Sequence, residues 1–324
     1  MRRTTATASF TVLFFILSVS IEGLAQQTAQ RFIRETRFLL ALPAGYDSDT
    51  AARWPLVLFL HGSGESGMDL QKVKSHGPPK LADGAKSYPF ILVSPQADVA
   101  AGWNSEEIFK LLQYLKKEYR VDRDRVYLTG LSMGGYGTWD IAQKYPNEFA
   151  AIAPICGGGD SSLAWKLRNM PIWCFHGAKD NVVPLSESEV MVKAVRSFNP
   201  DVRFTVYPEA AHNSWDAAYD NDSLYQWMLS QKKFRYTEKR VVPSLLKEYA
   251  GTYVGPQNDT VRIALENGML MARTKGATIP LKSAGDGSFF INPEAQDELH
   301  FVRRKEGVTG FSLLTGRKQW FRRL

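Results

Sequence analysis

The residues that most clearly indicate chemistry form one short motif near the middle of the chain. Residues 130–134, with the sequence GLSMG, are the only Gly-x-Ser-x-Gly in the protein. An apolar run over residues 126–129 precedes the motif, and a helical pattern over residues 133–144 follows it. A sharp turn between a strand and a helix lifts a serine above the edge of a sheet, and glycines flank it because larger side chains would clash. The pattern predicts Ser132 as a nucleophile; the alternative is an ordinary strand-to-helix turn with a structural serine.

A serine hydroxyl needs a base beside it, and the base needs an acid to orient it. At a strand-turn-helix serine of this kind the chain order is serine, acid, histidine. The five histidines are His61, His76, His176, His212 and His300. Only His212 and His300 come late enough, and His300 lies within an alternating strand pattern that indicates a structural role. We therefore predict His212, in the loop after a strand over residues 202–207, as the base.

The acid should lie just beyond the end of a strand, on the same side of the sheet as the serine. Asp180 follows the apolar run 171–175 and fits this rule best. Asp160 follows the preceding run and is the second choice. Asp140 falls inside a helix and Asp201 begins a strand, so neither is a good candidate.

A tetrahedral intermediate carries an oxyanion, which two preorganised backbone N–H groups should face. One donor is expected from Met133, the residue after the nucleophile. The other is expected from the glycine-rich loop 61–64, which follows the apolar run 55–60, and Ser63 is the predicted donor.

The elements that must hold these residues alternate between strand and helix across residues 26–233. Strand-like runs cover 37–42, 55–60, 90–94, 126–129, 150–156, 171–175 and 202–207, and helical patterns cover 105–120, 133–144 and 186–198. Ser105 is the expected N-cap of the first helix. Apolar strands alternating with helices predict an α/β fold with a mostly parallel sheet and helices on both faces.

The pattern changes after a linker predicted over residues 234–246. From 247 to 324 short strand-like runs follow one another, separated by turn formers such as Asn267-Gly268 and Asp286-Gly287. We predict a small antiparallel β domain, a barrel or a sandwich.

The first 25 residues resemble an export signal. Arg2 and Arg3 are followed by the apolar run 10–21 and by small residues near Ala25. The sequence thus predicts a secreted or periplasmic protein, against the alternative of a retained amphipathic anchor. No later run is long enough to span a bilayer. The net charge is +7, and the basic residues are scattered apart from a local excess at 303–305 and 317–323. A solvated strand face is expected there in preference to a polyanion or membrane-surface patch, and we expect no nucleic-acid partner.

Cysteine usage argues against a disulfide framework or a metal site. The two cysteines, Cys156 and Cys174, lie in apolar runs, and two buried thiols are expected in preference to a bridge. No zinc-ligand spacing occurs, so we predict no metal and no cofactor.

Four segments together resemble the α/β-hydrolase superfamily: residues 60–64, 130–135, 176–184 and 212–215. They are most similar to the bacterial carboxylesterases of the polyhydroxybutyrate-depolymerase-like and feruloyl-esterase-like type. The resemblance covers about residues 35–232. It implies Ser132, Asp180 and His212 as a catalytic triad, and it implies that Trp103 and Trp215 border the substrate pocket, unless both simply pack. The tail is similar to small β domains appended to bacterial hydrolases.

The function expected from these residues is hydrolysis of a carboxylic ester through an acyl-enzyme on Ser132, with an acylated polysaccharide as a suitable substrate. A serine peptidase of the prolyl-oligopeptidase type and an acyltransferase are the alternatives, and a binding protein without activity is a third. No long helical insert separates Cys156 from Pro171, so we expect an open site without a large lid.

Overall fold

The computed structural model describes residues 35–84, 86–98, 102–285, 287–295 and 297–324. The predicted export signal, residues 1–25, lies outside these ranges, as does Asp286 of the second predicted turn. No helix among the described residues is long and apolar enough to cross a membrane.

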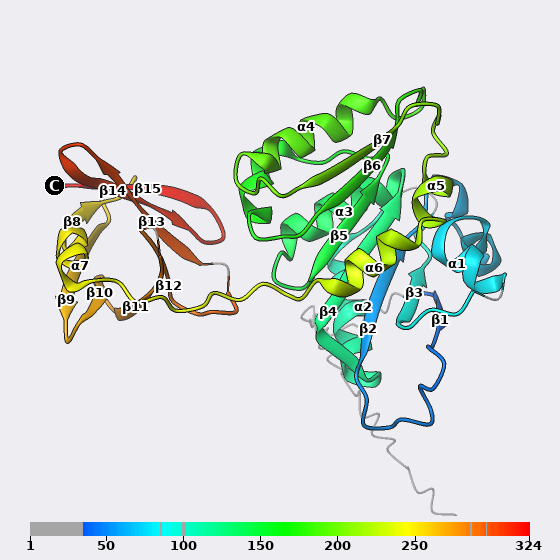
Figure 1. The fold of residues 1–324 in the computed structure, drawn as a ribbon, viewed down its shortest axis with the longest axis horizontal. Coiled ribbons are helices and arrows are strands. Elements are labelled where there is room, and N and C mark those ends of the chain that lie inside the picture. Colours follow the sequence, from blue (N-terminus) through cyan, green and yellow to red (C-terminus); the bar gives the residue numbers. More distant parts are fainter. Residues whose placement is uncertain (1–34, 85, 99–101, 286, 296) are drawn as a thin grey trace, which may run out of the picture. The chain divides into compact units, whose positions relative to one another are not determined.

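The first part of the fold is a seven-stranded sheet in the order β1-β3-β2-β4-β5-β6-β7 (Figure 1). Its strands are β1 (Phe38–Ala41), β2 (Trp54–Leu60), β3 (Ile91–Pro95), β4 (Val121–Leu131), β5 (Ala151–Ile155), β6 (Trp173–Gly177) and β7 (Arg203–Tyr207). Only β1 pairs antiparallel, with β3. The prediction of a mostly parallel sheet is confirmed.

Helices cover both faces of this sheet. They are α1 (Gly77–Asp83), α2 (Ser105–Glu118), α3 (Met133–Lys144), α4 (Leu185–Arg196), α5 (Trp215–Tyr219) and α6 (Asp222–Ser230), with 3₁₀ segments η1 (Ser63–Glu65), η2 (Leu70–Ser75) and η3 (Ser161–Leu167). Side chains alternate across β2. Leu56, Leu58 and Leu60 join one core with α2, α3 and α4, whereas Val57 and Phe59 join a second core with α5 and α6. A strand buried on both faces explains why β2 is apolar at every position.

The second part is a closed antiparallel barrel of eight strands. These are β8 (Gly251–Val254), β9 (Thr260–Glu266), β10 (Met269–Arg273), β11 (Thr278–Gly285), β12 (Ser288–Phe290), β13 (Glu298–Arg304), β14 (Gly307–Leu314) and β15 (Lys318–Arg323). Tyr253, Phe289, Phe301 and Phe311 pack ring against ring in its interior. Asn267 and Gly268 both have positive φ and form the predicted two-residue turn between β9 and β10. The predicted β domain is thus confirmed and is a barrel.

Several elements differ from the sequence prediction. Asn104, and not Ser105, caps α2, because its side-chain oxygen accepts from the N–H groups of Glu106 and Glu107. A helix that the pattern did not indicate, α7 (Pro243–Tyr249), crosses the predicted boundary between linker and barrel. Its Leu246 and Tyr249 are buried in the barrel core, and tertiary packing of this kind stabilises helices too short for periodicity to reveal.

The two cysteines are free and buried. Cys174 lies on β6 and belongs to one core, whereas Cys156 directly follows the neighbouring strand β5 and belongs to the other. Because the two side chains face opposite sides of the sheet, they form no bridge, as predicted.

The cap at Asn104 yields a stability prediction. Asn104→Ala removes the acceptor for two N–H groups at the start of α2 and should lower the free energy of unfolding by about 1 kcal/mol. Asn104→Asp keeps an acceptor and adds a negative charge at the helix N-terminus, so it should be close to wild type. Urea unfolding of the three proteins measures the difference. Equal stability of the Ala and Asp variants would show that this cap contributes nothing.

Candidate active site

Ser132 lies between β4 and α3 with a backbone that few non-glycine residues adopt. Its φ is 52° and its ψ is −117°. The Ser132 N–H donates to the carbonyl of Ile155, on the neighbouring strand, at 3.0 Å. Strain of this kind persists only where the surrounding structure imposes it, and here it presents the hydroxyl at the carboxyl edge of the sheet.

Close approach of the backbone explains the glycines around Ser132. A Cβ on Gly134 would lie 2.0 Å from the carbonyl oxygen of Leu60, and one on Gly135 would lie 2.3 Å from that of Ile155. Contacts this short do not occur for real Cβ atoms. The start of α3 can therefore lie against the ends of β2 and β5 only with glycine at these two positions.

His212 lies in the loop after β7, within hydrogen-bonding distance of the serine. Its Nε2 is 3.0 Å from Ser132 Oγ, and its Nδ1 is 2.8 Å from Asp180 Oδ2. A carboxylate accepts hydrogen bonds, so Nδ1 carries the proton and Nε2 is left to accept from the serine. The imidazole is 19% exposed, so solvent and substrate reach it.

The Asp180 side chain is fully buried, yet its oxygens are well supplied with donors. Oδ1 accepts from the N–H groups of Val182 and Val183, both at 2.9 Å. Oδ2 faces His212 and also His176 Nε2, at 3.3 Å. Burial alone would raise the pKa of the Asp180 carboxyl, but the hydrogen bonds from His212, Val183 and Val182 outweigh it and hold that pKa below its ordinary value. The acid is therefore ionised at neutral pH.

The structure places the other candidates elsewhere. Asp160 is exposed and caps η3 by accepting from the Ser162 N–H at 2.9 Å. His300 lies on β13 and bonds Ser288, on the adjacent barrel strand. Of the groups that the sequence offered as acid and base, the structure brings Asp180 and His212 to Ser132.

The two predicted oxyanion donors are each the first residue of a helical segment. Met133 begins α3 and Ser63 begins η1, and the first N–H groups of a helix have no partner within it. The loop that carries Ser63 lies against the nucleophile, because a Cβ on Gly62 would be 3.7 Å from Ser132 Cβ and 2.8 Å from Leu131 Cδ1. This arrangement is suited to binding a negatively charged oxygen beside Ser132.

A buried histidine holds this loop in place. His61 Nε2 accepts from the Ala97 N–H at 3.0 Å, and its Nδ1 donates to the Gly62 carbonyl. Burial lowers the pKa of the His61 imidazole, more than its bond to Gly62 and its neighbour Glu65 raise it. The neutral ring can donate from one nitrogen and accept at the other, as these two bonds require.

The predicted pocket tryptophans have different surroundings. Trp103 donates from its indole nitrogen to the His61 carbonyl at 3.1 Å and packs against the His61 ring, so it supports the loop. Trp215, at the start of α5, contacts the rings of both His212 and His76, with centroid distances of 5.1 and 5.4 Å. Trp215 thus contacts His212, a member of the hydrogen-bonded triad, whereas Trp103 contacts the loop that carries Ser63.

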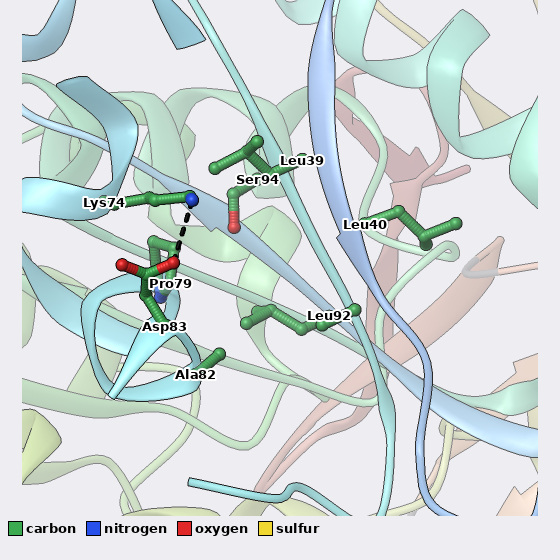
Figure 2. Close-up of a pocket in the computed structure, with 9 residues that line it drawn as sticks. Leu39, Leu40, Lys74, Pro79, Ala82, Asp83, Leu92 and Ser94 are labelled. Atoms are coloured by element: carbon green, nitrogen blue, oxygen red, sulfur yellow. Dashed lines mark ion pairs between the residues drawn. The ribbon is translucent and has the colours of Figure 1, made fainter. Parts of the chain in front are cut away.

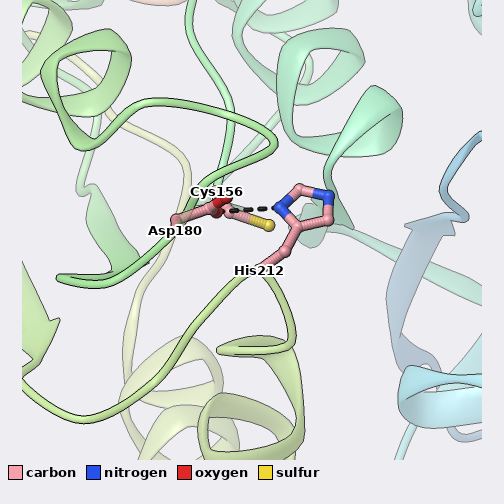
Figure 3. A group of neighbouring side chains, drawn as sticks. All are labelled: Cys156, Asp180 and His212. Atoms are coloured by element: carbon pink, nitrogen blue, oxygen red, sulfur yellow. Dashed lines mark hydrogen bonds and ion pairs between the residues drawn. The ribbon is translucent and has the colours of Figure 1, made fainter.

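A cysteine completes a group of potential metal ligands behind the histidine. Cys156, Asp180 and His212 offer ligand atoms within 4.8 Å of one another, the one such group among the described residues (Figure 3). Burial raises the pKa of the Cys156 thiol to about 12, and metals bind the thiolate. Asp180 and His212 already bond each other, so the group suits proton transfer better than metal binding.

A separate cavity of about 300 Å³ lies between β1, β3 and α1 (Figure 2). Leucines 39, 40 and 92 line one side, and the ion pair between Lys74 and Asp83 lies on the other. None of Ser132, Asp180 and His212 lines it, so this cavity is not the site of their chemistry.

Three residues around the site were not found from the sequence: His61, His176 and Glu65. The chain order excluded His61 and His176 as the base, and it gave no information about the hydrogen bonds by which they support the site. The four-residue spacing between His176 and Asp180 was the available signal for one of them. Glu65 directly follows the glycine-rich loop, but nothing in the pattern indicated that its carboxyl group is buried.

The fold and the site define an α/β-hydrolase. Residues 98–233 match the model of the dienelactone hydrolase family. The match includes Ser132, Asp180 and His212, the three residues that the structure joins by hydrogen bonds.

Individual relatives cover the same region. The chain is 31% identical over 187 residues to a bifunctional acetylxylan esterase/xylanase of Neocallimastix patriciarum, which covers 56% of this chain and 27% of the relative. It is 30% identical over 130 residues to poly(3-hydroxyalkanoate) depolymerase C of Paucimonas lemoignei, covering 34% and 30%. The chain thus spans less than a third of the length of these curated relatives.

Among solved structures, a thermostable esterase is 32% identical with a TM-score of 0.53, covering 61% of this chain and 59% of that one. This similarity supports the α/β-hydrolase fold for the matched part of the chain.

The loop geometry predicts that substitution of Gly62 lowers activity whereas substitution of Gly64 does not. In Gly62→Ala the new Cβ crowds Leu131 and Glu65 and displaces the loop that carries the Ser63 N–H. Loss of one oxyanion donor costs about 10²–10³-fold in kcat, so a decrease up to this size is expected. Gly64→Ala is the control, because nothing lies within 4 Å of its Cβ position. Steady-state hydrolysis of a nitrophenyl ester measures both; equal kcat values would remove this loop from the site.

Proposed function

We propose that this protein is a serine carboxylester hydrolase that removes acyl groups from a polysaccharide. The observation that carries the proposal is the hydrogen-bonded chain from Ser132 through His212 to the buried Asp180 carboxylate. This arrangement supplies a nucleophile, a base in the required tautomer and an ion that stabilises the imidazolium.

In the first half of the reaction Ser132 Oγ attacks the ester carbonyl while His212 Nε2 takes its proton. The carbonyl oxygen becomes an oxyanion, which the N–H groups of Met133 and Ser63 stabilise. His212 then gives the proton to the departing alkoxide, and the acyl group remains on Ser132. Asp180 stays ionised throughout and stabilises the charged imidazolium.

In the second half a water molecule replaces the alcohol. His212 Nε2 takes a proton from the water as the water oxygen attacks the acyl carbonyl. When the second tetrahedral intermediate collapses, the bond to Ser132 Oγ breaks and His212 returns the proton to that oxygen. The carboxylic acid leaves, and the enzyme is restored.

The shape of the site supports a bulky alcohol component. Among described residues the connection between β5 and β6 holds only the seven-residue segment η3, and His212 is partly exposed. The relatives include, by name, a bifunctional acetylxylan esterase/xylanase and a poly(3-hydroxyalkanoate) depolymerase. A polymeric ester outside the cell would also agree with the export signal predicted over residues 1–25, and we propose a secreted or periplasmic location.

The proposal is tested with a panel of esters: acetylated xylan, ethyl ferulate and short-chain nitrophenyl esters. Wild type should hydrolyse at least one of the polysaccharide-type substrates, and Ser132→Ala should retain less than about 1% of that activity because the acyl-enzyme cannot form. The variant should unfold at the wild-type temperature, since the hydroxyl fills no core space. Full activity in Ser132→Ala would exclude the mechanism.

The identity of the acid gives a second prediction. Asp180→Asn offers an amide donor to His212 Nδ1, favours the wrong tautomer and should lower kcat by about 10⁴-fold. Asp160→Asn is the matched control and should leave kcat unchanged, because Asp160 only caps η3. The measurement is kcat of both variants on the ester that the wild type hydrolyses best. A large decrease in kcat for Asp160→Asn with none for Asp180→Asn would show that Asp160 is the acid.

A further inference from the structure

A second cavity, which we call the amino-edge cavity, lies where β6 and β7 begin. It has a volume of about 350 Å³. Ser132 and His212 lie at the opposite, carboxyl edge of the sheet. Because β7 is five residues long, the two edges are about 17 Å apart. The polar side chains that line the cavity are Arg168, Asn169, Asn199, Asp201, Arg203 and Gln231.

Two opposite charges line the amino-edge cavity without pairing. The Arg203 guanidinium lies against the rings of Trp173 and Trp227, at 5.2 and 5.7 Å from their centroids, and these contacts hold it in place. In the described part of the chain, the side chains of Arg203 and Asp201 form no ion pair or hydrogen bond. Both residues are exposed, so a ligand in the cavity can reach them. The cavity thus offers a positioned set of donors and a separate acceptor.

Two amide side chains in the same cavity are already fixed. Asn199 Nδ2 donates to the Met170 carbonyl at 2.7 Å, and its Oδ1 accepts from a backbone N–H two residues further on. Gln231 Nε2 donates to the Trp227 carbonyl at 3.1 Å and to Ser230 Oγ at 2.7 Å. An amide has four hydrogen-bonding positions, so each keeps capacity for a ligand. Polar groups fixed in this way lose little conformational entropy on binding.

This lining favours a neutral ligand with several hydroxyl groups. An anion would be repelled by Asp201 and a cation by Arg203. A hydroxyl can donate to the one and accept from the other. Trp227 adds apolar surface to the cavity, and a pyranose presents apolar C–H faces as well as hydroxyl groups. Arg168 also lines the cavity, but it already donates to the Trp165 carbonyl at 3.3 Å.

We propose that the amino-edge cavity binds a neutral sugar unit of the same polysaccharide whose esters Ser132 cleaves. Binding at one edge of the sheet holds the polymer near the protein, and this raises the effective concentration of its ester groups at the other edge. The inference rests on the proposed function, because only a polymeric substrate can occupy both edges.

The test measures binding to a soluble neutral arabinoxylan by its retardation of the native protein in polyacrylamide gels. The polymer should retard the wild type. Asp201→Ala and Arg203→Ala should each raise Kd by about tenfold, or about 1.4 kcal/mol, because each removes a charged hydrogen-bonding group. Glu189→Ala and Lys117→Ala, at exposed charges on α4 and α2, are the matched controls and should keep the wild-type Kd.

Activity on a small and a large substrate distinguishes this site from a general disturbance of the fold. On nitrophenyl acetate, Asp201→Ala and Arg203→Ala should keep the wild-type kcat/KM, because the amino-edge cavity lies away from Ser132. On acetylated xylan their KM should rise while kcat stays constant. Melting temperatures check that each variant is folded, and the two variants test the same cavity independently.

The outcomes separate this inference from the function on which it rests. Equal retardation of the wild type and both variants by arabinoxylan would place the sugar elsewhere and overturn the proposal, as would no retardation of the wild type. Stronger retardation by polygalacturonate than by arabinoxylan would indicate an anion-binding surface and would also overturn it. Each of these results leaves ester hydrolysis intact. Retardation of a wild type that hydrolyses no ester would refute the proposed function and leave the sugar site.

Discussion

The hydrogen bond between His212 and the buried carboxylate of Asp180 is the interaction on which the site depends. A carboxylate without solvent exposure is stable only when donors surround it, and here three hydrogen bonds are directed at its two oxygens. Two come from the backbone turn after β6. The third comes from His212, delivered by the loop after β7. The parallel pairing of β6 with β7 brings these loops out at the same edge of the sheet.

Close backbone packing fixes the other half of the site. Gly134 and Gly135 let the first turn of α3 touch the ends of β2 and β5, and this forces Ser132 into its strained turn. The same crowding sets the loop after β2 against the nucleophile, where His61 and Trp103 tie it to neighbouring segments. The serine, its base and the two predicted N–H donors are therefore positioned by backbone contacts rather than by flexible side chains.

The sequence was sufficient for the features that backbone rules dictate. The strand–GLSMG–helix pattern located Ser132. The order rule reduced five histidines to His212 and His300, and the strand-end rule favoured Asp180 over Asp160. The structure joins Ser132, His212 and Asp180 by hydrogen bonds. Apolar runs located the seven strands that the structure describes in the sheet, and short runs separated by turn formers predicted an antiparallel barrel or sandwich after residue 247. These signals are local in the chain or follow from parallel strands sharing one edge.

What the sequence did not reveal depends on tertiary contacts. Asn104 and Ser105 are equally good capping residues by type, and only the entry of the chain into α2 selects Asn104. The short helix α7 has too few turns to show a period, and it forms because Leu246 and Tyr249 fill the barrel. Glu65 resembles any surface glutamate in the sequence, and its burial depends on tertiary contacts such as the hydrogen bond that Gln96 donates to the Glu65 carbonyl. Trp103 was expected at the substrate pocket, whereas its contacts are with the loop that it supports.

The central claim is that the contact with His212, itself oriented by Asp180, makes Ser132 the nucleophile. It is tested most directly by treating the native protein with a fluorophosphonate, which reacts only with an activated nucleophile, and locating the adduct by peptide mass spectrometry. The account predicts one adduct per chain, on the peptide containing Ser132, with loss of activity in proportion to labelling. An adduct on another residue such as Ser63, or an active enzyme that does not label, would contradict it.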